Sequence, residues 1–283
     1  MADRLTLDEM VPAATVQWLV VTDLDGTMLN HDSYDMEAAR EAIKLLQDKN
    51  IPVILNTSKT FAETITIRQM LDIRDAFIVE NGSCLYLPKN RFDRPADATE
   101  RDDYWSIILG ASHQQIENIL LSIGLPDAAA IRLSRCSIEQ TVALTGLNAA
   151  QAGQAVAREF SEPLIWQADK KALSDFRQQL RQHGLATLQG GRFLHVIGNC
   201  DKGMATKRLT SCYRDDVRII ALGDSANDAA MLSVADISII VNSPSNHQLQ
   251  ERITADIHTQ QPAPDGWRDA IEKSLKQIHL IEE

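Results

Sequence analysis

Residues 18–27, WLVVTDLDGT, decide how the rest of the sequence is interpreted. The run WLVVT is apolar and rich in β-branched side chains, which predicts a buried strand. Asp23 and Asp25 follow it directly, with Gly26 as a turn residue. In an open α/β sheet, ligands bind beyond the carboxyl ends of the strands, so both carboxylates are expected to face one crevice. Two such carboxylates repel each other unless a cation lies between them or one of them holds a proton.

Outward from this stretch, strand patterns and helix patterns alternate along the chain. The apolar strands are short and continuous, which is typical of strands buried on both faces. The alternation therefore predicts an α/β fold with a doubly wound parallel sheet covered by helices. A hairpin turn is expected at Asn81-Gly82. The predicted strands are 18–23, 51–56, 76–80, 192–198, 217–222 and 236–241, and the helices next to them are 36–49, 60–71, 201–209 and 267–281.

The texture of the sequence changes after residue 88. Residues 89–103 are charged and lack periodicity, which is typical of a loop leaving a domain. The chain up to residue 190 then combines short apolar pieces with helices whose predicted N-caps are Ser112, Ser137, Asn148 and Asp169. We therefore expect a core made of residues 1–88 and 191–283, interrupted by an inserted α+β cap domain at 89–190.

A second acidic motif, GDSAND at 223–228, also follows a predicted strand and precedes a helix. Its two aspartates should therefore lie on the same sheet edge as the first pair. Mg2+ prefers a few carboxylates together with water and phosphate oxygens, so this edge suits a hard cation. The sequence predicts a Mg2+ site whose ligands come from Asp23, Asp25, Asp224 and Asp228.

Two further segments on this edge carry groups that can bind phosphate. Thr57 and Ser58 end the second strand, where a hydroxyl and backbone N–H groups can hold phosphate oxygens. Lys202 begins the helix after the strand at 192–198, so its ammonium can reach the same crevice. A lysine in the first turn of a helix is usually solvated, and the interpretation of Lys202 depends on the motifs around it.

Taken in order, these segments resemble the four motifs of the haloacid-dehalogenase-like phosphatase superfamily. The resemblance implies that Asp23 is a nucleophile forming an aspartyl phosphate and that Asp25 is the general acid and base. It also implies a role for the large insert as the cap domain that closes over the substrate. The phosphoryl group is then expected to contact Thr57, Ser58, Lys202 and Asn227.

Finer features are similar to mannosyl-3-phosphoglycerate phosphatases, a branch of this superfamily. Capped sugar phosphatases usually have Thr-Gly-Arg after the second strand, whereas this chain has TSKT at 57–60. The segments ENG at 80–82, GGRF at 190–193 and NCDKG at 199–203 fit the same branch. The resemblance implies a substrate that carries both a phosphate and a carboxylate.

Within that branch the candidate substrate contacts are Lys59, Glu80 and Arg192. A general sugar-phosphate phosphatase and a phosphomutase share every motif, so both stay open as alternatives. A non-catalytic phosphosugar-binding protein is the alternative from another class, although every expected catalytic residue is present.

Composition limits the partners that this protein can have. It carries 28 Lys and Arg against 39 Asp and Glu, a formal net charge of −11. Such a surface repels nucleic acid and anionic membranes, so the expected partner is a small phosphorylated molecule. No obligate protein partner is indicated. The four cysteines are scattered, and no apolar stretch has the length of a signal peptide or membrane span, so we expect a cytoplasmic protein.

Overall fold

The structure, a computed structural model, describes residues 17–30, 36–190, 193–213 and 216–282. Its largest feature is a nine-stranded sheet in the order β13-β12-β11-β1-β2-β3-β4-β6-β5. Strand β1 lies near the centre and pairs in parallel with β11 and β2. The predicted α/β fold with a parallel central sheet is confirmed. The strands are β1 Trp18–Thr22, β2 Val53–Asn56, β3 Phe77–Val79, β4 Cys84–Pro88, β5 Thr99–Arg101, β6 Tyr104–Ile108, β11 Arg218–Gly223, β12 Ile237–Asn242 and β13 Ile257–Pro262.

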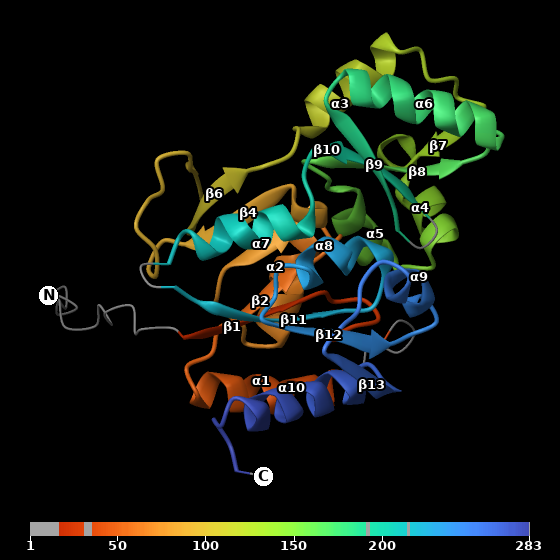
Figure 1. The fold of residues 1–283 in the computed structure, drawn as a ribbon. Coiled ribbons are helices and arrows are strands. Elements are labelled where there is room, and N and C mark those ends of the chain that lie inside the picture. The colour runs from red at the N-terminus through yellow and green to blue at the C-terminus, as the bar shows by residue number, and fades with distance from the viewer. Residues whose placement is uncertain (1–16, 31–35, 191–192, 214–215, 283) are drawn as a thin grey trace, which may run out of the picture.

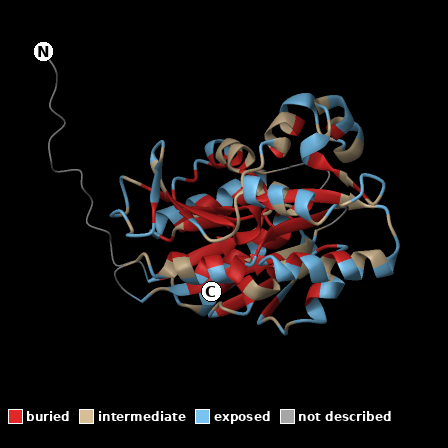
Figure 2. Cartoon of the chain, turned by 90° about the horizontal axis from the view of Figure 1, so that it is seen from above, coloured by how far each residue is buried: buried red, intermediate tan, exposed pale blue. Residues whose placement is uncertain are grey.

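Helices cover both faces of this sheet (Figure 1). Alternate residues of β1 point to opposite faces, so Val20 packs with α1, α2 and α10, whereas Leu19 and Val21 pack with α7, α8 and α9. The inner strands of the sheet are almost wholly buried (Figure 2), namely β1, β2, β3, β4, β11 and β12. The helices are α1 Glu37–Asp48, α2 Phe61–Met70, α7 Lys202–Thr210, α8 Ala229–Leu232, α9 Asn246–Gln250 and α10 Asp265–Gln277.

A smaller part stands beside the carboxyl edge of the large sheet (Figure 1). It contains a four-stranded antiparallel sheet in the order β7-β8-β10-β9, and α3 and α6 pack on one of its faces. All four predicted N-caps in this part accept the expected backbone hydrogen bond. Its elements are α3 His113–Ser122, β7 Ala130–Arg132, α4 Ile138–Thr145, α5 Ala149–Val156, β8 Ser161–Trp166, α6 Lys170–Gln182, β9 Leu185–Gln189 and β10 Leu194–Gly198.

Two segments pair differently from the sequence-based expectation. Strands β5 and β6 fall within the expected insert, yet β6 pairs with β4 and extends the large sheet. Strand β10 falls within the expected core, but it lies between β8 and β9 in the small sheet. The boundaries at 88/89 and 190/191 stay a prediction, and sheet membership leads us to propose 109–198 as the cap.

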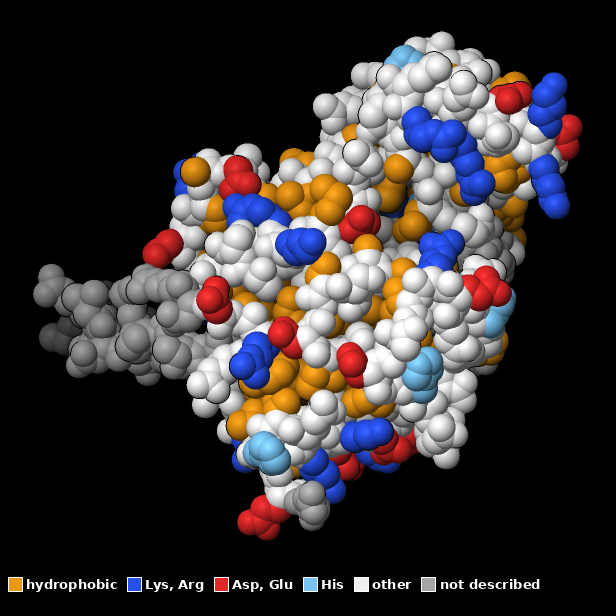
Figure 3. All heavy atoms as spheres, in the orientation of Figure 1, with side chains coloured by type: hydrophobic (Ala, Val, Ile, Leu, Met, Phe, Trp, Pro, Cys, Tyr) orange, Lys and Arg blue, Asp and Glu red, His pale blue; other side chains and the backbone are white. Residues whose placement is uncertain are grey.

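The surface carries charges of both signs. On the face drawn in Figure 3, acidic and basic side chains are interspersed over the described residues. Within the described ranges, no helix combines the length and apolar character needed to cross a bilayer.

Candidate active site

The first acidic pair lies at the carboxyl end of β1. The backbone N–H of Asp23 donates to the carbonyl of Leu222 at 3.0 Å, which continues the pairing with β11 beyond the strand. The chain then turns, and the N–H groups of Met28 and Leu29 both return to the carbonyl of Leu24. Asp23 is buried, whereas the side chain of Asp25 is 27% exposed. The turn thus places one carboxylate inside the site and the other at its mouth.

The second acidic motif follows β11 and lies against the first. The Oδ2 atom of Asp228 accepts hydrogen bonds from the N–H groups of Asp224 at 3.1 Å and Ser225 at 3.0 Å, so this carboxylate holds its own loop. The hydroxyl of Thr27 donates to Asp224 Oδ1 at 3.0 Å and joins the two motifs directly. The predicted meeting of the two motifs at one sheet edge therefore takes place.

Lys202 connects the motifs from a third element. Asp201 caps α7 by accepting from the N–H of Met204, and Lys202 follows as the first helical residue. Its ammonium lies 2.6 Å from Asp23 Oδ1 and 2.6 Å from Asp228 Oδ1. Burial acts to lower the pKa of Lys202, but the charges of Asp228 and Asp23 outweigh it and raise the pKa above its usual value. Lys202 is therefore a buried, permanently charged ammonium within the site.

Asp23 has an unusual protonation equilibrium. Burial is the largest cause that raises its pKa, and the charges of Asp228 and Asp224 act in the same direction. Lys202 opposes them, and the result is a pKa of about 7. A carboxylate in this position needs further positive charge before it is fully ionised at neutral pH.

The acidic cluster fits a magnesium ion. Carboxylate oxygens of Asp23, Asp224 and Asp228 lie within 4.8 Å of one another, and all three residues are buried. Among the described residues, no group donates a hydrogen bond to the buried Oδ1 atom of Asp25. Oxygen donors gathered at this spacing are the set that Mg2+ prefers. Lys202 and backbone N–H groups engage both oxygens of Asp228, so this carboxylate also supports its own loop and the lysine, and its part in the predicted metal site stays a prediction.

The loop after β2 runs beside these acids. Thr57 is fully buried, and its hydroxyl accepts from the N–H of Lys59 at 3.2 Å, which closes a tight turn around Ser58. The ammonium of Lys59 lies 2.7 Å from Asp25 Oδ2. The structure thus brings Thr57, Ser58 and Lys59 to the same edge as the acidic motifs, with Lys59 held by the outer carboxylate.

Other sequence-predicted residues have less direct positions. Asn227 donates from Nδ2 to Asn81 Oδ1 at 3.1 Å, a link between the second acidic motif and the turn after β3. The carboxylate of Glu80 contacts the chain at 159–161 in the small part instead of facing the acidic cluster. Arg192 lies outside the described residues. Sequence reasoning did not identify Asn81 as part of the site, although it sits in the ENG segment next to a predicted strand end.

The fold and the site define a class of hydrolase. The sequence pattern of the haloacid dehalogenase-like hydrolases matches residues 20–122 and 154–266, which span both parts of the molecule. The chain therefore belongs to this family. The solved structure of a phosphatase of the haloalkanoate enzyme superfamily from Bacteroides thetaiotaomicron has the same fold, with a TM-score of 0.69 and 18% identity; the match covers 97% of this chain and 100% of that one.

Two relatives with curated names narrow the comparison. Both are called glucosyl-3-phosphoglycerate/mannosyl-3-phosphoglycerate phosphatase. The relative from Methanococcoides burtonii is 36% identical over 259 residues, which cover 89% of this chain and 95% of that protein. The relative from Persephonella marina is 31% identical over 266 residues, covering 92% of this chain and 98% of that protein.

Proposed function

We propose that this hydrolase is a magnesium-dependent phosphatase that removes the phosphate of mannosyl-3-phosphoglycerate or its glucosyl analogue through an aspartyl-phosphate intermediate. The observation that carries the chemistry is the buried cluster in which Lys202 bridges Asp23 and Asp228 beside Asp224. The two curated relatives, similar along nearly the whole chain, support the substrate.

Asp23 is the proposed nucleophile. Lys202 holds Asp23 Oδ1, which leaves the other carboxylate oxygen to attack phosphorus. A phosphate monoester is a dianion and repels a carboxylate, so the site needs positive charge. Mg2+ held by Asp23, Asp224 and the backbone carbonyl of Asp25 would supply charge that offsets this repulsion. Lys202 and the hydroxyl and backbone groups of the loop at 57–58 would hold the remaining phosphoryl oxygens.

Asp25 is the proposed general acid and base. Lys59 holds its Oδ2 atom, and its Oδ1 atom is free of hydrogen bonds from the described residues, so Oδ1 is the atom for proton transfer. In the first step the bond from phosphorus to the ester oxygen breaks, and Asp25 gives its proton to the leaving alkoxide. In the second step Asp25 takes a proton from water, which attacks the aspartyl phosphate and releases inorganic phosphate and free Asp23.

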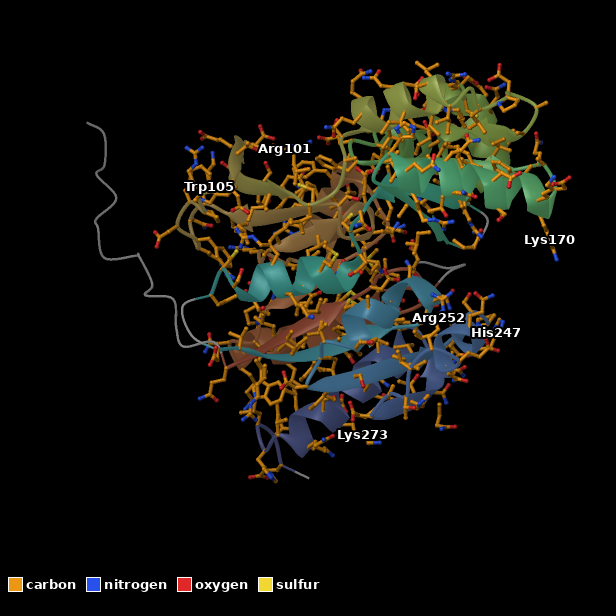
Figure 4. The ribbon with its side chains drawn as sticks, turned by 45° about the horizontal axis from the view of Figure 1, so that its top comes forward. Arg101, Trp105, Lys170, His247, Arg252 and Lys273 are labelled. Atoms are coloured by element: carbon orange, nitrogen blue, oxygen red, sulfur yellow. The ribbon has the colours of Figure 1, made fainter. Side chains whose placement is uncertain are left out.

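The proposed substrate brings a carboxylate as well as a phosphate, so cations beyond the metal are needed. Lys59, which pairs with Asp25, is one candidate beside the acidic motifs, and Arg192 is a further candidate from the sequence. Arg252 donates to the carbonyl of Ala226 at 3.3 Å and lies on the side of the large part that faces the small part (Figure 4). It adds positive charge where the two parts meet.

Phosphate release from purified protein tests the proposal. We expect higher kcat/KM for mannosyl- or glucosyl-3-phosphoglycerate than for hexose phosphates, and loss of turnover in EDTA with recovery on adding Mg2+. Asp23→Asn keeps the side-chain shape but cannot form the acyl phosphate, so it should lower kcat by more than about a thousandfold while still unfolding cooperatively. Higher kcat/KM for plain hexose phosphates would replace this substrate with a general sugar phosphate, and full activity in EDTA would exclude the mechanism.

A further inference from the structure

The turn after β3 contacts two loops of the active site. Its three residues, η2 Glu80–Gly82, are buried and all left-handed, with φ of 49°, 61° and 93°. The N–H of Glu80 donates to the carbonyl of Lys59 at 3.0 Å, and the N–H of Asn81 donates to the carbonyl of Thr57 at 2.9 Å. Backbone bonds thus fasten the turn to the loop proposed to bind phosphate. Asn81 also accepts from Asn227, the link described above.

The side chain of Glu80 points the other way, to the small part of the molecule. Its Oε1 atom accepts from the N–H of Glu159 at 2.9 Å. Its Oε2 atom accepts from the N–H of Phe160 at 3.1 Å and from the hydroxyl of Ser161 at 2.5 Å. Ser161 is the first residue of β8, so Glu80 holds the entry to the small sheet. Both carboxylate oxygens are used in these contacts.

Neighbouring residues add to the same junction. Arg158 donates to the carbonyl of Ser58 at 2.7 Å, and the carboxylate of Glu159 accepts from Arg101 at 2.6 Å. Arg101 lies on β5, whereas Lys170 marks the outer end of the small part, well away from the junction (Figure 4). The segment 158–161 is therefore attached to the large part at several points, of which Glu80 is the most buried.

Burying a carboxylate here costs free energy unless nearby charges and hydrogen-bond donors stabilise it. Glu80 is 1% exposed, and burial raises its pKa, although the charge of Arg158, the hydroxyl of Ser161 and two N–H groups oppose this rise. An apolar side chain would fill the space but would leave the N–H groups of residues 159 and 160 without these acceptors. The carboxylate therefore defines how the segment 158–161 sits on the turn.

We propose that Glu80 is a positioning residue that sets the small part relative to the phosphate-binding loop, so that a substrate touching both parts is held correctly for attack. The backbone of the turn fixes the loop and its side chain fixes the small part. Changing the side chain of Glu80 alone should therefore alter the position of the small part and leave the phosphate-binding loop in place. This inference rests on the proposed phosphatase function, and it assigns Glu80 a role other than direct substrate contact.

The test compares two substrates in the full-length protein with Mg2+. Mannosyl-3-phosphoglycerate is large enough to touch both parts, whereas p-nitrophenyl phosphate needs little beyond the phosphate-binding groups. Glu80→Gln keeps the size of the side chain but presents an amide N–H2 where an acceptor is needed. We expect kcat/KM for the sugar ester to fall about tenfold, with p-nitrophenyl phosphate changed less than about twofold.

Two further variants make the result decisive. Glu63→Gln is the matched control, because a glutamine at this position still completes the capping box of α2, and it should change neither substrate. Ser161→Ala removes one contact from the opposite side. It should also lower the ratio of kcat/KM for the sugar ester to kcat/KM for p-nitrophenyl phosphate, and it provides the test even if Glu80→Gln proves unstable. Proportional losses on both substrates, or an unchanged ratio in both variants, would overturn the positioning role.

The proposed function can fail separately from this inference. If the wild type prefers hexose phosphates, the proposed substrate is wrong. The ratio of a hexose phosphate to p-nitrophenyl phosphate in Glu80→Gln and Ser161→Ala then tests the positioning role in the same way. If the wild type hydrolyses no phosphate ester, both proposals are overturned.

Discussion

At the scale of single residues, the site is a balance between negative groups and one buried ammonium. Three buried aspartates lie around Lys202, which contacts two of them. Burial raises the pKa of Asp23, the charges of Asp228 and Asp224 add to the rise, and Lys202 only partly offsets it, so the pKa is about 7. The sequence argument from paired acids, that either a cation or a proton must occupy the site, therefore has a physical counterpart in Asp23.

This balance predicts that Mg2+ and a proton compete for Asp23. At pH values below the Asp23 pKa of about 7, the metal must displace the Asp23 proton. Its apparent affinity should therefore weaken about tenfold for each unit by which the pH falls. Above that pH, Asp23 is already ionised and the affinity should level off. Calorimetric titration of Mg2+ across this range, in buffers of different ionisation enthalpy, measures both the affinity and the protons released.

The variant Asp23→Asn supplies the control for this competition. It should bind Mg2+ more weakly, and without the proton release that wild type shows below the pKa. If the variant keeps the pH dependence of wild type, a different group titrates and the assignment to Asp23 is incorrect.

At the scale of elements, structure that depends on neighbouring residues could be predicted from the sequence, whereas several strands that depend on partners elsewhere in the chain could not. Helix caps such as Ser112 and Asp169 are readable because each acts within three residues of itself. Strand β5 has the sequence TER and β13 the sequence IHTQQP, both polar, so neither carries the apolar pattern of a strand. Their existence depends on partners elsewhere in the chain, β6 and β12.

The same distinction applies to the candidate site. The motifs at 23–25 and 223–228 could be placed together because parallel strands present their carboxyl ends at one edge. The ion pair between Lys59 and Asp25 joins loops that follow different strands, and no sequence pattern predicts it. The contact between Arg158 and Ser58 requires the small part to fold against the large one, which lies beyond what a single sequence indicates.

The turn at Gly82 leads to a prediction about α7. A Cβ atom there would lie 2.2 Å from the carbonyl oxygen of Asp201 and 2.9 Å from the N atom of Lys202, and φ is +93°. Gly82→Ala should therefore push the start of α7 away and move Lys202 from the acids. We expect the free energy of unfolding to fall by more than about 2 kcal/mol and kcat to fall at least about tenfold.

Gly146→Ala separates strain from collision. Gly146 is also left-handed, with φ of +79°, but nothing lies within 4 Å of an added Cβ atom. This variant should lose only about 1 kcal/mol in denaturant unfolding and keep the kcat of wild type. If both variants have the same kcat, the close approach of Gly82 to α7 does not position Lys202.

At the scale of the whole molecule, the active site joins distant stretches of the chain. Asp23 follows β1 near the beginning, Lys202 begins α7, and Asp224 follows β11, which pairs with β1 at the centre of the sheet. A binding site formed by these three residues exists only when both halves of the part that contains the nine-stranded sheet have folded together. Binding there should stabilise the entire large part instead of one loop.

Mg2+ and Ca2+ should therefore both stabilise the fold, but only Mg2+ should support turnover. Mg2+ at about a hundred times its dissociation constant should add about 2.7 kcal/mol to the free energy of unfolding and raise Tm, because the unfolded chain has no assembled site. Ca2+ should also raise Tm, since it binds the same carboxylates. It should inhibit turnover, because its larger and looser coordination shell misplaces the nucleophile relative to phosphate.

Scanning calorimetry and phosphate release, measured on the same samples, check this expectation. Asp224→Asn should lose most of the Tm increase with both ions, whereas Asp127→Asn, whose side chain is 90% exposed in the small part, removes the same charge and should keep it. This comparison distinguishes a specific site from general relief of repulsion in a protein of net charge −11, because relief of that kind would be equal in the two variants. Turnover with Ca2+ equal to that with Mg2+ would show that strict octahedral coordination is unnecessary, and the proposed role of the metal would then be wrong.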